Sequence, residues 1–114
     1  MGVVVYIDDE PALCRAFSIM LRATEWALHT FTDPEAALDF VEAHPVDVVV
    51  CDLRMPRMTG RQFRARMTSE AAFILTSGDL LAQDEVGAMS GVSAFLPKPF
   101  QPEQLLKLIR DALE

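Results

Sequence analysis

The chain has 114 residues, of which 51% are hydrophobic and 24% are charged, and its net charge at pH 7 is −7. This length and composition are typical of one globular domain, which we expect to span residues 1–114. The negative charge argues against direct binding of nucleic acid, because the phosphates would be repelled. No apolar run approaches the roughly 20 residues needed to cross a bilayer. No basic region precedes the first apolar run, so neither membrane association nor a secretory signal is expected.

The two cysteines, Cys14 and Cys51, are too few for a disulfide framework and lack the spacing of a metal motif. Cysteines of this kind are usually buried and unpaired in a reducing compartment. We therefore expect two free thiols and a cytoplasmic protein.

Short apolar runs alternate with segments of helical periodicity along the chain. The expected strands are residues 3–7, 27–31, 46–51, 71–75 and 93–96. The expected helices begin near Pro11 and Pro34, cover about 60–67 and 81–89, and begin again at Pro102. Strand–helix alternation predicts an α/β domain with a parallel sheet and helices on both faces. The pattern alone leaves the order of the strands open.

Polar side chains follow four of the apolar runs, where the strands are expected to end. Asp8 and Asp9 follow the first run, Asp52 the third, Thr76 the fourth and Lys98 the fifth. Because the carboxyl ends of parallel strands meet at one edge of a sheet, we expect three carboxylates, a hydroxyl and an ammonium group in one crevice. Clustered carboxylates raise one another's pKa unless a cation compensates. Mg²⁺ suits such a site, since it favours a few protein oxygens together with water and phosphate.

Each of these residues also has a simpler explanation when it is considered singly. An aspartate such as Asp8, Asp9 or Asp52 often only caps a helix or ends a strand. The combination with Thr76 and Lys98, each at its own strand end, favours a shared site that binds a divalent metal and a phosphoryl group.

Segments in the same order resemble the receiver domains of response regulators from two-component signalling. They are Ile7-Asp8-Asp9-Glu10-Pro11, Asp52-Leu53-Arg54-Met55-Pro56 with Gly60, Leu75-Thr76-Ser77-Gly78 and Lys98-Pro99-Phe100. Each segment is modestly specific, but together they are highly specific and cover the whole chain. The resemblance implies a doubly wound, flavodoxin-like (βα)5 domain with a five-stranded parallel sheet of order 2-1-3-4-5.

The resemblance also implies a role for each residue of the crevice. Asp52 would be the phosphoacceptor and would take its phosphoryl group from a phosphohistidine. Asp8, Asp9, Asp52 and the backbone carbonyl of Arg54 would bind Mg²⁺, for which Mn²⁺ could substitute. Lys98 would pair with an oxygen of the phosphoryl group.

The same resemblance implies a conformational switch. Thr76 would donate its hydroxyl to the phosphoryl group, although the neighbouring Ser77 competes for this role. Phe95 would then turn inward, the simpler alternative being that it is an ordinary core aromatic. The change would alter the face formed by the fourth helix, fifth strand and fifth helix. The bond between Lys98 and Pro99 is expected to be cis.

Two positions close to the phosphoacceptor are expected to set the lifetime of the phosphoryl group. Gly78 would leave the site open to water, whereas Arg54 could either shield the phosphoryl group or orient the attacking water. Arg54 also belongs to a group of arginines that form either a solvated helix face or a docking surface for an acidic partner. The group comprises Arg54, Arg57, Arg61, Arg64 and Arg66.

The sequence therefore favours a phosphorylatable signalling switch that assists its own phosphorylation and dephosphorylation but is not otherwise an enzyme. Its expected partners are a sensor histidine kinase or histidine phosphotransfer protein, and an output domain or downstream protein. Homodimerisation on phosphorylation is a further expectation taken from the family. Whether the chain acts alone or belongs to a longer regulator stays open.

Two alternatives compete with the phosphorylatable switch. A receiver-like interaction module that works without phosphorylation would not need the complete set of crevice residues. A phosphatase or flavodoxin on a similar sheet is disfavoured by Asp8-Asp9-Glu10-Pro11, which offers neither an aspartate pair separated by one residue nor a phosphate-binding loop.

Overall fold

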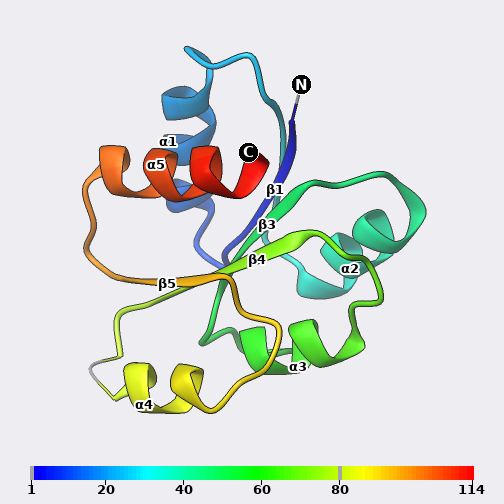
Figure 1. The fold of residues 1–114 in the computed structure, drawn as a ribbon, viewed down its shortest axis with the longest axis vertical. Coiled ribbons are helices and arrows are strands. Elements are labelled where there is room, and N and C mark those ends of the chain that lie inside the picture. Colours follow the sequence, from blue (N-terminus) through cyan, green and yellow to red (C-terminus); the bar gives the residue numbers. More distant parts are fainter. Residues whose placement is uncertain (1, 80) are drawn as a thin grey trace.

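The computed structural model describes residues 2–79 and 81–114, which form a parallel sheet with helices on both faces (Figure 1). The strands are β1 (Val3–Ile7), β2 (Ala27–Phe31), β3 (Val48–Asp52), β4 (Ala72–Ser77) and β5 (Ala94–Pro97). They lie in the order β2-β1-β3-β4-β5, and every neighbouring pair is parallel. The expected fold class and strand order are confirmed.

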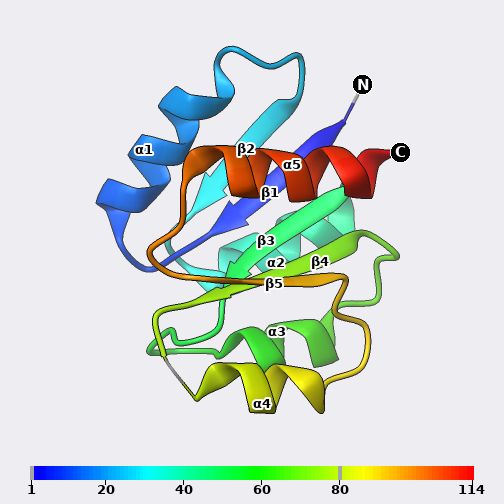
Figure 2. The same ribbon diagram turned by 60° about the vertical axis from the view of Figure 1, so that its left-hand side comes forward.

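The helices divide between the two faces of the sheet. They are α1 (Pro11–Leu21), α2 (Pro34–Ala43), α3 (Gly60–Arg66), α4 (Ala82–Gly87) and α5 (Pro102–Leu113). In Figure 2, α1 and α5 cover one face, and α2, α3 and α4 cover the other. Each side has its own apolar core, and all the residues of β3 are buried between them. This burial explains the continuous apolar sequence of β3.

Local sequence signals account for the starts of most helices. Prolines occupy the first turn of α1, α2 and α5, where a missing N–H costs nothing. The Asp33 side chain accepts the Glu35 N–H at 3.0 Å and so caps α2. Thr59 and Gln62 form a reciprocal capping box at the start of α3. Among the described residues, every helix is too short or too polar to span a membrane.

Several element boundaries differ from the sequence-based expectation by one or two residues, and β4, for example, ends at Ser77 rather than residue 75. The third strand begins at Val48 rather than residue 46, and the Asp47 side chain just before it accepts the Val3 N–H at 2.8 Å. The fourth helix covers Ala82–Gly87 rather than 81–89, because the N–H groups of Ala88 and Met89 bond three residues back and tighten the last turn.

Gly60 holds the loop after β3 close to the sheet. Its N–H donates to the Leu53 carbonyl at 2.9 Å. A Cβ at this position would lie 2.5 Å from Leu75 Cδ2 and 3.0 Å from the Asp52 carbonyl oxygen. The absence of a side chain therefore allows α3 to begin directly against the end of β3.

We expect Gly60→Ala to lower the free energy of unfolding by about 1–3 kcal/mol, because the added methyl group overpacks a buried contact with backbone. Urea denaturation measures the change. Gly87→Ala is the matched control, since a Cβ there would meet nothing within 4 Å. The control should be neutral or slightly stabilising, as alanine is the better helix former. Equal losses in the two variants would contradict the packing account.

Candidate functional site

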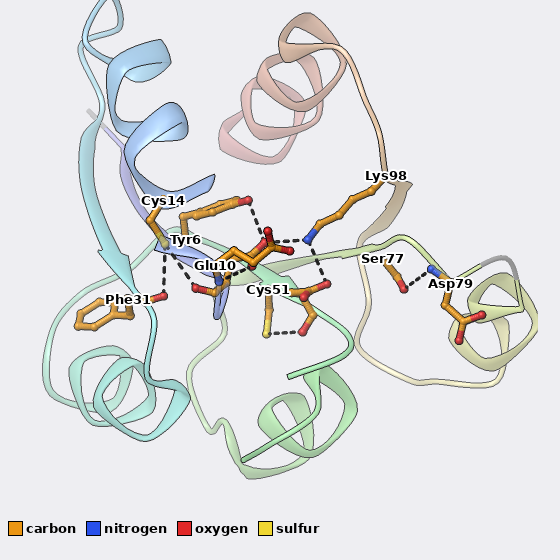
Figure 3. A network of polar contacts seen from close by, with 10 residues as sticks. Tyr6, Glu10, Cys14, Phe31, Cys51, Ser77, Asp79 and Lys98 are labelled. Carbon is orange, nitrogen blue, oxygen red and sulfur yellow. Dashed lines mark hydrogen bonds and ion pairs between the residues drawn. The ribbon is translucent and has the colours of Figure 1, made fainter. Parts of the chain in front are cut away.

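The sheet brings the predicted crevice residues to one edge. Asp52 ends β3 and lies opposite Thr76 of β4 in the parallel register. Asp8 follows the end of β1 directly, and Lys98 follows the end of β5. The Asp8 and Lys98 side chains meet at 2.8 Å although they are 90 residues apart in sequence. In Figure 3, Lys98 extends from the end of its strand across the crevice.

The three aspartates lie close enough to share a cation. One carboxylate oxygen from each of Asp8, Asp9 and Asp52 falls within 4.8 Å of the others. Asp8 and Asp52 are buried, whereas Asp9 is exposed. Lys98 Nζ lies 2.8 Å from Asp8 Oδ2 and 3.4 Å from Asp52 Oδ1, so its one ammonium group pairs with two of the three carboxylates. This excess of hard oxygen ligands fits Mg²⁺.

The environment of Asp52 disfavours its charged form. Burial is the main cause, and the neighbouring Asp8 charge adds to it, while Lys98 opposes both. The pKa of Asp52 is raised to about 6. Burial would by itself lower the pKa of Lys98, but its bonds and charge contacts with Asp8 and Asp52 raise it. Asp52 is thus largely ionised at neutral pH, at an energetic cost to the folded protein.

Thr76 carries the clearest sign of a missing partner. Its side chain is 1% exposed, and its Oγ1 is the one buried side-chain polar atom in residues 2–79 and 81–114 without a hydrogen bond. Ser77 Oγ, in contrast, already accepts the Asp79 N–H at 3.0 Å. Of the two hydroxyls, that of Thr76 is therefore the one with no hydrogen-bond partner.

The side chain of Arg54 is engaged outside the carboxylate cluster. Its Nε and Nη2 donate to Asp79 Oδ2 at 3.1 and 2.8 Å, and its Nη2 also donates to Glu85 Oε2 at 2.7 Å. These hydrogen bonds raise the pKa of the guanidinium. Gly78 is exposed, and a Cβ there would approach only the Lys98 Cβ, at 3.9 Å. The position after Thr76 and Ser77 is thus open to solvent.

Three other sequence-based expectations concern residues around the site. Phe95 is half-buried and packs against the core formed with α2, α3 and α4. The Lys98–Pro99 peptide bond is cis. Among the arginine group, Arg57 and Arg66 pair with Asp33 and Glu35. Arg64 donates to the carbonyls of Gly91 and Met67.

Sequence reasoning missed two neighbours of Asp8. The Tyr6 hydroxyl donates to Asp8 Oδ2 at 3.4 Å, and its ring stacks on Phe17 with centroids 4.3 Å apart. The Cys14 thiol contacts the Asp8 carbonyl at 3.5 Å. Figure 3 shows Tyr6 and Cys14 together on the side of the crevice nearest α1. Tyr6 could have been found, because residues two apart in a strand share a face and it is the one polar side chain in β1.

Comparison with known proteins agrees with this geometry. The family model for the response regulator receiver domain matches residues 4–110. The chain therefore belongs to the response regulator receiver domain family. It is 32% identical over 110 residues to the heme response regulator HssR of Staphylococcus epidermidis, covering 94% of this chain and 49% of that protein. It is 30% identical over 114 residues to the response regulator MprA of Mycolicibacterium vanbaalenii, and the match covers 96% of this chain and 49% of that protein.

Solved structures resemble the whole chain. The chemotaxis response regulator CheY4 of Vibrio cholerae superposes with a TM-score of 0.85 at 27% identity, covering 98% of each chain. Full-length FixJ from B. japonicum superposes with a TM-score of 0.88 at 29% identity, covering 98% of this chain and 57% of that one. The chain spans about half the length of the curated relatives it matches.

We expect Asp52→Asn to stabilise the metal-free protein at pH 7 by about 1–3 kcal/mol, because it removes a buried carboxylate whose ionised form is disfavoured. The pKa of Asp52 is higher in the folded protein, about 6 against 3.8, so its ionisation destabilises the fold as the pH rises through this window. The advantage of the variant should be present at pH 7 and absent near pH 3.5. Urea denaturation in the presence of a chelator measures it.

The exposed Asp84 provides the control, since it makes no ion pair among the described residues. Asp84→Asn should leave stability nearly unchanged at both pH values. A stability gain for Asp52→Asn that is the same at both pH values would contradict the electrostatic explanation.

Proposed function

We propose that residues 1–114 act as a phosphorylatable switch in which Asp52 accepts a phosphoryl group from a histidine kinase or a histidine phosphotransfer protein. The observation that carries this proposal is the buried Thr76 hydroxyl, which has no partner and lies beside Asp52. Leaving a buried hydroxyl unpaired costs free energy. A phosphoryl oxygen on Asp52 would supply the acceptor that the folded chain lacks.

The transfer uses the ionised carboxylate of Asp52. One of its oxygens attacks the phosphorus of the phosphohistidine, the P–N bond breaks, and the imidazole leaves with the electron pair. Held by Asp8, Asp9, Asp52 and the Arg54 backbone carbonyl, Mg²⁺ (or Mn²⁺) would neutralise charge on the phosphoryl group in transfer. The product is an acyl phosphate on Asp52.

Lys98 is placed to serve both states of the proposed switch. In the unphosphorylated chain its ammonium group pairs with Asp8 and Asp52, which limits repulsion between their carboxylates. After transfer it would pair with a phosphoryl oxygen. The lysine would thus exchange one anionic partner for another without leaving the crevice.

The output would arise from the movement of Thr76 toward the phosphoryl group. That movement vacates space in the core, which Phe95 would fill by turning inward, and it would shift the face formed by α4, β5 and α5. Phosphorylation would change the relative populations of two packings of this face. An output domain, a downstream protein or a second copy of the chain would then bind the favoured packing in the cytoplasm.

Phosphorylation with acetyl phosphate tests the acceptor directly. Intact-mass spectrometry should detect one added phosphoryl group in the presence of Mg²⁺ and none when a chelator is added. Asp52→Asn should remove the adduct, whereas Asp84→Asn should retain it. An adduct that persists in Asp52→Asn would contradict the assignment. A chain that gives no adduct and no NMR change with beryllofluoride would instead be a phosphorylation-independent interaction module.

Thr76→Val tests the switch separately from the acceptor. The substitution keeps the shape of the side chain and removes the unpaired hydroxyl, so we expect the free energy of unfolding to rise by about 1 kcal/mol. Phosphorylation of Asp52 should continue, but the NMR signals of Phe95 should no longer respond to beryllofluoride.

Ser77→Ala is the matched control for the hydroxyl. It should leave the response of Phe95 intact, because Ser77 Oγ has a partner in the Asp79 N–H, whereas the hydroxyl left unpaired is that of Thr76. A response of Phe95 that survives in Thr76→Val and disappears in Ser77→Ala would assign the switching hydroxyl to Ser77 instead.

A further inference from the structure

Arg54 joins two loops at the carboxyl edge of the sheet. It lies in the loop after β3, two residues beyond Asp52, and its guanidinium contacts Asp79 in the loop after β4 and Glu85 in α4. The three side chains are 47%, 33% and 28% exposed. The donor–acceptor distances are 2.7–3.1 Å, and two guanidinium nitrogens donate to the same oxygen, Asp79 Oδ2. We refer to Arg54, Asp79 and Glu85 as the arginine clamp.

Asp79 is held in place to receive the guanidinium. Its Oδ1 accepts the Leu81 N–H at 2.9 Å, and its own N–H donates to Ser77 Oγ at 3.0 Å. The Leu81 N–H and Arg54 lower the pKa of Asp79, so its carboxylate is charged at all ordinary pH values. Because Asp79 is both charged and held by these two hydrogen bonds, the guanidinium of Arg54 has a partner in a fixed position.

The clamp is also weak enough to be released. Ion pairs between exposed side chains contribute only modestly to stability, because water screens them and ordering long side chains is unfavourable. A phosphoryl group on Asp52 would bring close to two negative charges into the neighbourhood of Arg54. The guanidinium would then have two competing sets of anionic partners, the clamp carboxylates and the phosphoryl oxygens.

We propose that Asp79 and Glu85 are positioning residues that hold the Arg54 side chain away from phosphorylated Asp52 and so keep the acyl phosphate accessible to water. This inference rests on the proposed function, since it concerns the lifetime of the product. Gly78 contributes no side chain that could shield the phosphoryl group. When the clamp is weakened, Arg54 swings onto the phosphoryl oxygens, covers the approach of water and lengthens the lifetime of the acyl phosphate.

The lifetime is measured by following the acyl phosphate after removal of acetyl phosphate, with intact-mass spectrometry at fixed pH and Mg²⁺ concentration. Asp79→Asn keeps the acceptor for the Leu81 N–H but removes the charge, so the turn is retained. We expect Asp79→Asn to lengthen the half-life about two- to fivefold, and Asp79→Asn with Glu85→Gln to lengthen it further. Asp84 lies in α4 beside Glu85 but outside the clamp, so Asp84→Asn is the control, and its acyl phosphate should have the same half-life as that of the parent chain.

The Arg54→Ala background separates positioning from a general change in the loop. There Asp79→Asn should have no effect on the half-life, because no guanidinium remains to be released. A second readout is the NMR signal of the Arg54 Nε–H, which should move when Asp79→Asn is introduced, and should move again in that variant on addition of beryllofluoride.

The outcomes distinguish this inference from the proposed function. Adducts that form on every variant with equal half-lives would overturn the positioning role and leave the phosphoacceptor intact. A longer half-life for Asp79→Asn that persists in the Arg54→Ala background would also overturn it. Failure of the parent chain to form an adduct would overturn the proposed function and this inference together.

Discussion

The pairing of β3 with its two neighbours is the constraint on which the site depends. Parallel register places Asp52 opposite Thr76, and the Leu53 N–H bonds to the Thr76 carbonyl just beyond the last strand pair. A shift of one residue would turn Asp52 to the opposite face and separate it from Lys98. Because the apolar run of β3 is bounded by Asp47 and Asp52, such a shift would also draw one of these carboxylates toward the buried interior. Packing of the two cores therefore determines the geometry of the crevice.

The crevice concentrates negative charge in a place where folding alone would not favour it. Lys98 pairs with the two buried carboxylates of Asp8 and Asp52, the exposed Asp9 lies beside them, and burial together with the Asp8 charge raises the pKa of Asp52. A buried hydroxyl is left unpaired beside them. The Mg²⁺ ion and phosphoryl group of the proposed function would offset both costs by bringing positive charge and phosphoryl oxygens to the same point. The arginine clamp adds a cation that the folded chain keeps engaged elsewhere.

Much of the fold could be predicted from the sequence, because it depends on local patterns. Apolar runs, helix-starting prolines and the family resemblance indicated the strands and their order, and the structure brings the strand-end residues together at one edge. The end of α4 and the start of β3 were missed, and the end of α4 depends on individual hydrogen bonds. The partners of Arg54 were missed because they are 25 and 31 residues away, and no periodicity links positions so distant. The role of each site residue stays a prediction.

The position of β5 at the edge of the sheet has a consequence for the two cores. Successive residues of a strand point to opposite faces. Phe95 packs with the core under α2, α3 and α4, whereas Leu96 packs with the core under α1 and α5. All five strands contribute side chains to both cores in this alternating way, so the two cores are coupled through the whole sheet. A change in helix packing on one face that moves β5 would therefore reach the helices on the other face through the adjacent residues Phe95 and Leu96.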